Sequence, residues 1–387
     1  MQKIYLDNAS TTFPKPKCVT DSIVTYMTEI GCNINRGCYA DAYSVEEMIF
    51  NTRSLLAVMF NATDCKNVVF TKNITESLNV IIKGFLKPGD HVLVSSMEHN
   101  AVMRPLVQCE KIGISFSRIP CLSDGELCLD AIPSLIKPNT KAIIMTHASN
   151  VCGTVMPLKE VGAFCKNHSL RFIVDTAQSA GILPIDMQEM NISALAFTGH
   201  KCLLGPQGIG GFILSEEMVD EVEPLIVGGT GSISHTEDIP NFMPDKFESG
   251  TLNIPGIQGL HASLEWINDK TPKALLEHEL SLTEAFLNGL KPLEDAGLIQ
   301  IIGKKDLAGR TGIVSVKTLT LDQSEVAYAL DSKYGIMTRV GLHCAPNAHK
   351  TLGTYPEGTI RFSFGFSNTL SDVEASINAL KEIFNGI

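Results

Sequence analysis

The sequence has few basic residues, and no stretch of it is rich in Lys or Arg: 31 basic residues stand against 42 acidic ones, a formal net charge of −11. Nucleic-acid surfaces are usually basic because they neutralise phosphates, so this balance argues against nucleic-acid binding. No apolar run approaches the roughly 20 residues that span a bilayer, and residues 1–7 lack the long apolar core of a signal peptide. These absences predict a cytoplasmic protein with no nucleic-acid or membrane partner.

Motifs for disulfides, metals and dinucleotides are also missing. The 11 cysteines are an odd number at irregular spacing, and no two of them form a C-x-x-C pair. Neither a disulfide framework nor a zinc ribbon is indicated, and no metal is expected. Most of the thiols are expected to pack as small hydrophobic side chains, among them Cys18, Cys32, Cys38, Cys65 and Cys109. No internal repeat occurs, and no G-x-G-x-x-G stretch lies between a strand and a helix.

Seven short apolar runs are the main structural signal. The chain has 387 residues, 44% of them hydrophobic, which is enough to bury a substantial core. The runs alternate with helical patterns or turns and span residues 67–71, 91–95, 114–119, 142–146, 171–175, 194–198 and 210–214. Helices are expected over residues 46–60, 75–86 and 99–109. This alternation predicts an α/β fold with a seven-stranded, mostly parallel sheet in a large domain.

The composition changes after the last of these runs. Residues 228–250 are rich in Gly, Ser, Thr, Pro and Asp, which predicts an exposed hairpin or loop that could serve a partner subunit. From residue 256 a long helical stretch leads to strands at 312–316 and 359–363 and to a closing helix from Ser371. We therefore predict a large domain of residues 15–255 and a smaller α+β domain of residues 1–14 and 256–387.

Two polar residues follow two of the buried strands. Asp175 ends one strand, and Lys201 follows another, 26 positions later, so both side chains can open on one edge of the sheet. A surface-loop lysine is the ordinary alternative. A buried lysine instead pairs with a carboxylate or loses its proton and attacks carbonyls. A lysine and an aspartate so placed suit pyridoxal phosphate, which needs an amine for its aldehyde and a carboxylate for its ring nitrogen.

Two further positions stand at the same predicted edge. Thr75 lies where a strand passes into a helix, so backbone N–H groups and the positive end of the helix could hold a phosphate there. An ordinary helix cap by Asn73 or Thr75 is the alternative. His99 follows a strand and a turn, and its ring could stack on a flat pyridine. A histidine with an ordinary structural role is the alternative there.

Nine motifs along the chain carry a resemblance to a known family. They are Tyr5-Leu-Asp-Asn-Ala9, Asn73-Ile-Thr-Glu-Ser77, Glu98-His-Asn-Ala101, Ser149-Asn-Val-Cys-Gly-Thr154, Val174-Asp-Thr-Ala-Gln178, Thr198-Gly-His-Lys201, Phe247-Glu-Ser-Gly-Thr251, Arg339-Val-Gly-Leu-His-Cys344 and Ile360-Arg-Phe-Ser363. Their kind and order resemble the fold-type I pyridoxal-phosphate enzymes of aminotransferase class V. Within that class the chain is most similar to the cysteine desulfurases and selenocysteine lyases.

The resemblance implies roles for individual residues around pyridoxal 5'-phosphate. For the cofactor it implies that Lys201 forms the covalent link, Asp175 pairs with the ring nitrogen, Gln178 bonds the ring hydroxyl, His99 stacks on the ring, and Thr75, Thr198 and His200 hold the phosphate. For the substrate it implies Asn150 and Arg361 as holders of the α-carboxylate, with Arg339 and His343 beside them. Arg361 in a structural ion pair is the alternative. Thr251 lies in a motif that reaches the partner's phosphate, which implies a homodimer.

The resemblance also assigns a thiol. Cys344 stands where family desulfurases keep their sulfur-accepting cysteine, on a loop expected between a helix and the strand that bears Arg361. An incidental cysteine is the alternative. His343 and Arg339 are expected to favour its thiolate form. Only 16 residues lie between Cys344 and Arg361, which resembles the second type of the family, with a short catalytic loop.

The implied reaction removes sulfur from L-cysteine and gives L-alanine and a persulfide on Cys344, with Lys201, Cys344 and His99 as catalytic residues. Selenocysteine is a second candidate substrate, and a sulfur or selenium acceptor protein is a candidate partner. The alternatives on the same fold are a cysteine β-lyase and an aminotransferase of small amino acids. A non-catalytic binding protein is the alternative from a different class.

Overall fold

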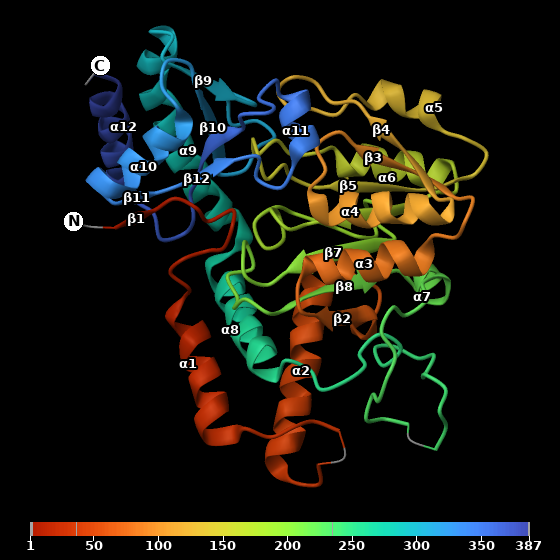
Figure 1. Ribbon diagram of the computed structural model, residues 1–387. Coiled ribbons are helices and arrows are strands. Elements are labelled where there is room, and N and C mark those ends of the chain that lie inside the picture. The colour runs from red at the N-terminus through yellow and green to blue at the C-terminus, as the bar shows by residue number, and fades with distance from the viewer. Residues whose placement is uncertain (1–2, 36, 234, 386–387) are drawn as a thin grey trace.

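Seven strands form the central sheet of the protein. The structure is a computed structural model that describes residues 3–35, 37–233 and 235–385 (Figure 1). In spatial order the strands are β2 (Val68–Thr71), β8 (Gly210–Leu214), β7 (Ala194–Thr198), β6 (Arg171–Asp175), β5 (Thr140–Thr146), β3 (His91–Ser95) and β4 (Ser115–Ile119). Only β8 runs antiparallel to its neighbours, β2 and β7. The predicted seven-stranded, mostly parallel sheet is therefore confirmed.

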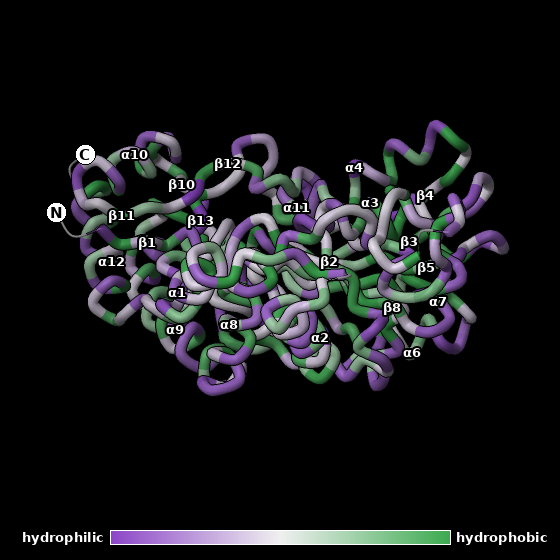
Figure 2. The backbone as a smooth tube through the Cα atoms, turned by 90° about the horizontal axis from the view of Figure 1, so that it is seen from below, coloured by the Kyte–Doolittle hydropathy of each residue, from purple (hydrophilic) through white to green (hydrophobic). Residues whose placement is uncertain are grey.

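Helices cover both faces of this sheet. Successive side chains of a strand point to opposite sides, so each strand contributes to an apolar core on either face. In β3, Leu93 enters one apolar core, whereas Val92 and Val94 enter the other. The first core is completed by α2 (Ala40–Met59), α6 (Leu158–Asn167) and α8 (Ile254–Lys270), and the second by α3 (Ile74–Phe85), α4 (Asn100–Cys109) and α7 (Glu216–Glu221). Figure 2 shows the same division, with hydrophobic strands inside and hydrophilic loops at the rim.

The predicted helices form, with shifted starts. The helix predicted over 46–60 begins six residues earlier, at Ala40; its first turns bury Ala42 and Val45 and leave their other residues exposed or partly exposed. α4 begins at Asn100, so His99 precedes the helix as its cap. Shorter helices complete this part of the chain: α1 (Lys17–Thr25), η1 (Tyr26–Ile30), η2 (Cys65–Asn67), η3 (Glu110–Ile112), η4 (Leu129–Ala131) and α5 (Ile132–Leu135).

The segment between α7 and α8 is a long loop. No strand or helix forms over residues 222–253 where the structure describes them, so the loop alternative is right and the hairpin alternative is wrong. The loop is fixed to the sheet by Glu248, whose carboxylate accepts hydrogen bonds from Phe70 N at 2.7 Å and from the buried Arg53 guanidinium at 2.6 Å. A buried charge pair of this kind holds one end of the loop against β2.

A second sheet and a third apolar core occupy the other side of the molecule (Figure 1). The antiparallel sheet has the order β12 (Arg339–Gly341), β13 (Thr359–Ser363), β10 (Ile313–Thr318) and β9 (Ile299–Ile302), and β1 (Ile4–Tyr5) pairs in parallel with β11 (Ile336–Met337). The helices here are α9 (Pro272–Asp295), α10 (Gln323–Tyr334), α11 (Pro346–Thr351) and α12 (Leu370–Asn385). The division of the chain at residue 255 stays a prediction; α8, just beyond it, packs against α1 and α2.

Among the described residues, the helices include none with the length and apolar character required to cross a bilayer.

Candidate active site

The carboxyl ends of the parallel strands gather the candidate residues. Asp175 is the last residue of β6 and lies opposite Thr146, the last residue of β5. On its other side it lies opposite Ala196 of β7, whose last residue is Thr198. Lys201 follows three residues later, in a turn. The Lys201 carbonyl accepts a hydrogen bond of 2.7 Å from the Thr12 hydroxyl. The strand-edge placement inferred for Asp175 and Lys201 is therefore the observed one.

Burial sets the ionisation of this pair. It lowers the pKa of Lys201, and the positive charge of Arg361 lowers it further. Burial likewise raises the pKa of Asp175, against a hydrogen bond of 2.9 Å that its carboxylate accepts from Ala177 N and against the charge of Lys201. The alternative of a surface-loop lysine is wrong, because a surface amine would not be desolvated in this way. An amine with a lowered pKa is a better nucleophile and proton acceptor at neutral pH.

His99 comes from the segment after β3, which is separated from β6 by β5. Its Nδ1 accepts a hydrogen bond of 3.0 Å from Ala101 N and so caps α4, which leaves the ring proton on Nε2. Burial, followed by the charges of Lys201 and Arg104, lowers the pKa of His99 to about 4. The ring is therefore neutral at pH 7. A neutral, partly buried imidazole at this edge is a suitable surface for an aromatic ring.

Two buried polar atoms at the end of β7 have no partner among the described residues: the hydroxyl of Thr198 and Nδ1 of His200. Buried polar atoms are nearly always hydrogen-bonded, so two neighbouring buried atoms without partners indicate a binding site for a polar ligand. The amino end of α3 lies beside them, because a Cβ on Gly210 would stand 2.9 Å from both Asn73 Cα and Phe197 O. These observations fit a phosphate group at this place.

Asn73 caps α3 and Thr75 is exposed in its first turn. The Asn73 side chain accepts the N–H of Glu76 at 3.0 Å, so the alternative of an ordinary cap holds for Asn73. Thr75 remains free to meet an anion at the positive end of the helix. Gln178, also predicted, is buried and donates through Nε2 to Ala9 O at 2.9 Å, which leaves its carbonyl oxygen and one N–H for other partners.

Arg361 is buried in an ion pair, as one of the alternatives predicted. Its Nη2 contacts Asp7 Oδ1 at 2.8 Å and Ser10 Oγ at 2.7 Å, and its Nη1 donates to Asn150 O at 3.0 Å. Nε has no partner among the described residues. Asn150 in turn donates its amide to His343 O at 2.7 Å. The guanidinium is thus held rigidly by three of its five N–H groups, which leaves Nε–H and one Nη1–H unused.

Asp7 is a residue of this site to which the sequence reasoning gave no role. Its carboxylate bridges Arg361 and the half-exposed Arg339, whose Nη2 lies 3.0 Å from Asp7 Oδ2. Asp7 lies two residues after the end of the short strand β1. This position near a strand end was the sequence signal that could have identified it as a site residue. His147 was missed in the same way: it follows β5, and its buried Nδ1 has no partner among the described residues.

Cys344 is exposed on the turn between β12 and α11. The helix expected before it is α10, and the short strands β11 and β12 lie between that helix and the thiol. The Cys344 carbonyl accepts a hydrogen bond of 2.8 Å from Asn100 N, the residue after His99. The thiol-bearing turn is therefore joined directly to the helix that His99 caps.

The two residues expected to favour the thiolate differ in charge. Burial, aided by the charge of Arg361, lowers the pKa of His343 far below its usual value, so His343 is neutral and brings no positive charge. The expectation is wrong for His343. Arg339 is charged and interacts with the Cys344 sulfur, although its main partner is Asp7.

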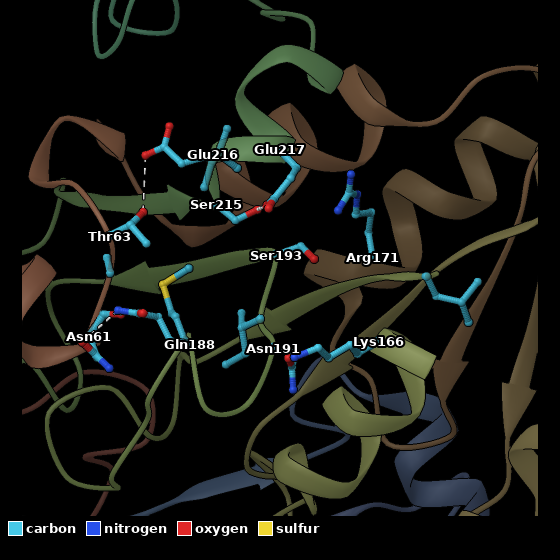
Figure 3. Close-up of a pocket in the computed structure, with 15 residues that line it drawn as sticks. Asn61, Thr63, Lys166, Arg171, Gln188, Asn191, Ser193, Ser215, Glu216 and Glu217 are labelled. Atoms are coloured by element: carbon cyan, nitrogen blue, oxygen red, sulfur yellow. Dashed lines mark hydrogen bonds between the residues drawn. The ribbon is translucent and has the colours of Figure 1, made fainter. Parts of the chain in front are cut away.

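The remaining predicted residue, Thr251, lies elsewhere. It is exposed in the long loop and lines a cavity of about 350 Å³ with Arg53 and Glu248, away from Lys201 and Asp175. Another cavity, of about 360 Å³, lies at the opposite edge of the sheet, between the amino ends of β6 and β7 (Figure 3). Arg171, Ser193 and Glu216 are among its lining residues, and none of the predicted site residues belongs to it.

Comparisons with known proteins point to one family. The family described as "Aminotransferase class-V" matches residues 4–375. A probable cysteine desulfurase of Methanothermobacter thermautotrophicus is 32% identical over 387 residues, covering 98% of this chain and 94% of that protein. The cysteine desulfurase CsdA of Escherichia coli is 30% identical, covering 97% of this chain and 93% of that protein.

A solved structure agrees with this result. The apo cysteine desulfurase of Thermococcus onnurineus has a TM-score of 0.92 and 31% identity, covering all of this chain (100%) and 95% of that one. The similarity therefore extends over both sheets and over every candidate residue described above.

Proposed function

This chain belongs to the aminotransferase class-V family, and on that premise we propose that it is a cysteine desulfurase dependent on pyridoxal 5'-phosphate. It takes sulfur from L-cysteine and leaves L-alanine and a persulfide on Cys344. The observation that supports this proposal is the hydrogen bond from Asn100 N to the Cys344 carbonyl, which joins the turn of the exposed thiol to the helix that His99 caps. An aminotransferase would have no use for a thiol at that place.

The residues at the strand edge fit the cofactor. We assign the covalent link to Lys201 Nζ, the ring nitrogen to Asp175, the ring face to His99 and the ring hydroxyl to Gln178. The unpartnered Thr198 hydroxyl and His200 Nδ1 support a phosphate there, together with the amino end of α3 and Thr75. When bound, the cofactor supplies an electron sink for the bonding pair released at the substrate α-carbon.

Lys201 performs the proton transfers in this proposal. Lys201 is partly buried and its pKa is lowered by desolvation, so its Nζ accepts the α-proton of the substrate and returns a proton to the product. Asp175 is also desolvated, and its carboxylate would stabilise positive charge on the ring nitrogen assigned to it. Arg361 and Asn150 would hold the substrate carboxylate, through the unused Arg361 Nε and the Asn150 side chain.

Cys344 performs the sulfur transfer. Its thiolate attacks the sulfur of the substrate, so a sulfur–sulfur bond forms while the carbon–sulfur bond breaks. The bonding pair stays on carbon, which takes up a proton and ends as the methyl group of L-alanine. The enzyme keeps the sulfur as a persulfide, which a thiol or an acceptor protein then removes. Selenocysteine can enter by the same route because selenium replaces sulfur in the bond that breaks.

A homodimer is part of the proposal. Several large apolar side chains of α1, η1 and α2 are exposed: Val24, Met27, Tyr43 and Phe50. Side chains of this kind, gathered on neighbouring elements, are normally covered by a partner. Thr251 is exposed in the loop fixed to β2, and we assign it to the phosphate site of the partner chain.

Product analysis tests the function. The purified protein, loaded with the cofactor, is incubated with L-cysteine and a reductant, and in parallel with selenocysteine. We expect alanine and sulfide or selenide in equal amounts, with no keto acid required. Pyruvate and ammonia in place of alanine would identify a β-lyase, and alanine formed only with an added keto acid would identify an aminotransferase.

A further inference from the structure

The backbone at the thiol has to be held in place. The φ angle is +46° at His343 and +57° at Cys344, and this left-handed conformation is unfavourable for a non-glycine residue. Three hydrogen bonds stabilise this turn: Ala345 N to Leu342 O at 2.8 Å, Asn150 Nδ2 to His343 O at 2.7 Å and Asn100 N to Cys344 O at 2.8 Å. All three hold the main chain, and the His343 side chain adds a fourth constraint.

A chain of hydroxyl groups determines which nitrogen of His343 carries the proton. Ser315 Oγ donates to Val151 O at 2.6 Å, and Thr359 Oγ1 donates to Ser315 Oγ at 3.1 Å. The Thr359 hydroxyl has then used its only proton, so it accepts from His343 Nε2, 3.0 Å away. His343 therefore carries its proton on Nε2, and its buried Nδ1 is an acceptor without a partner among the described residues.

His349 presents the opposite polarity from α11. It is fully buried, and its Nδ1 lies 2.7 Å from the Thr354 hydroxyl. That hydroxyl has one proton, and its other contact, with the His349 carbonyl, is long at 3.4 Å, so it donates to Nδ1. Burial lowers the pKa of His349 to about 4, so the ring is neutral at pH 7. His349 therefore carries its proton on Nε2, which has no hydrogen-bond partner at normal distance among the described residues, although the Leu342 backbone acts on the ring and opposes the lowering of the pKa of His349.

The elements that carry the two rings cannot easily separate. The turn after α11 is closed by a hydrogen bond of 2.7 Å from Gly358 N to Thr354 O. It approaches the end of β12 so closely that a Cβ on Gly358 would stand 2.3 Å from Gly341 C. The ring centroids of His343 and His349 are 5.4 Å apart, with an angle of 42° between the planes.

An unpartnered donor and an unpartnered acceptor thus lie on two adjacent buried rings. We propose that one water joins His349 Nε2–H to His343 Nδ1, and that His349 is a positioning residue for the Cys344 sulfur. The inference rests on the proposed function, since it assigns His349 to the thiol that accepts sulfur there. His349 acts through the His343–Cys344 turn and contacts none of the residues assigned to the cofactor.

The test compares two substitutions of His349. His349→Leu has similar bulk and no donor, whereas His349→Gln places an amide N–H near the position of Nε2. His168→Leu is the matched control. His168 is exposed, stacks on Phe164 and lies far from His349 in the sequence. Two rates are measured: alkylation of Cys344 by iodoacetamide in the protein without substrate, followed by peptide mass spectrometry, and the single-turnover burst of alanine from cysteine.

We expect His349→Leu to keep the cofactor absorption and the midpoint of thermal unfolding within a few degrees, while both rates change on the order of tenfold, because small displacements of a reacting atom have large effects. His349→Gln and His168→Leu should stay within about threefold of the unmodified protein. Unchanged rates in His349→Leu, or equal losses in His349→Leu and His349→Gln, would overturn the proposal. If the unmodified protein formed no alanine, the proposed function would fail, and the alkylation rates would still decide the role of His349.

Discussion

At the scale of single residues, burial rather than charge pairing determines the chemistry of the site. The pKa of Lys201 is lowered and that of Asp175 is raised, in both cases with desolvation as the largest cause. The exception is Cys344, whose thiol is exposed and lies in a turn held by hydrogen bonds. The residues that handle protons are therefore enclosed, whereas the residue that must pass sulfur onward is accessible.

Cys344→Ala separates these two tasks. We expect this variant to bind the cofactor normally, because every residue assigned to the cofactor lies elsewhere in the chain. Steady alanine formation from cysteine should fall at least about a hundredfold, because the attacking thiol is gone. The measurements are the cofactor spectrum, alanine formation and trapping of a persulfide at residue 344.

The unmodified protein and a control variant complete this experiment. The unmodified protein should show a burst of one alanine per site and then a slow phase that a strong reductant accelerates, since the persulfide must be removed before the next turnover. Cys65→Ala, at a thiol in the short helix η2, should behave like the unmodified protein. Desulfuration by Cys344→Ala at the unmodified rate would refute the assignment of this thiol.

At the scale of elements, one ion pair determines where the long loop lies. Arg53 of α2 and Glu248 of the loop are almost completely buried, and the carboxylate also accepts the N–H of Phe70 in β2. Arg53 further lies over the Phe70 ring, 4.5 Å from its centre. The pair therefore joins a helix, an edge strand and the loop that carries Thr251.

Arg53→Leu should destabilise the protein strongly. It leaves the Glu248 carboxylate buried without its partner, and breaking a buried ion pair in this way costs about 3–5 kcal/mol. The free energy of unfolding is measured by urea denaturation. Lys17→Leu is the control, because it removes an exposed pair with Asp21, which contributes about 0–1 kcal/mol. A loss for Arg53→Leu as small as the control's would contradict the structural role of the pair.

At the scale of the whole molecule, the site is proposed to need two chains. Mixing Lys201→Ala chains with Thr251→Ala chains under exchange conditions tests this, because a heterodimer would contain one pocket with both residues intact. At full random exchange roughly one site in four should be active, so activity should rise on mixing. Sedimentation gives the oligomeric state, and a fully active, cofactor-loaded monomer would disprove the proposal.

Stability should depend on pH in both directions. Six histidines have pKa values that burial lowers below the usual 6.5: His91, His99, His147, His200, His343 and His349. They stay neutral in the folded state while the unfolded chain takes up protons, so stability is lost as the pH falls from about 6.5 to about 4. Burial raises the pKa values of Glu98 and Glu279 from 4.5 to about 8, so their contribution is lost as the pH rises from about 4.5 to about 8 and outweighs that of the histidines only above about pH 6.5.

We therefore expect the cofactor-free protein to be most stable near about pH 6.5. Thermal or urea unfolding across pH 4–8.5 measures this. Glu279→Gln should remove about half of the decline above pH 6.5, because Glu98 still titrates, and should steepen the loss below pH 6.5, which Glu279 partly offsets in the unmodified protein. A stability that rises steadily from pH 6.5 to 8 would contradict the burial of these two carboxyl groups.

The sequence by itself determined the class of fold and the positions of the strand-end residues. Short apolar runs predicted all seven strands of the large sheet, and the rule that parallel strands end at one edge placed Asp175 beside Lys201. Local patterns carry this information because strands and helix caps depend on nearby residues. The same patterns gave the start of α2 six residues too late, where its first turns are largely polar or exposed.

Only the tertiary structure decided which side chains meet across long separations. The ion pair of Asp7 with Arg361 and the hydrogen bond of Asn100 with Cys344 each join segments that are far apart in the chain. The neutral state of His343 depends on the burial that such distant segments produce. Ionisation depends on desolvation, and desolvation depends on how completely distant segments enclose a group. For that reason the sequence alone gave His343 a positive charge that the folded protein removes.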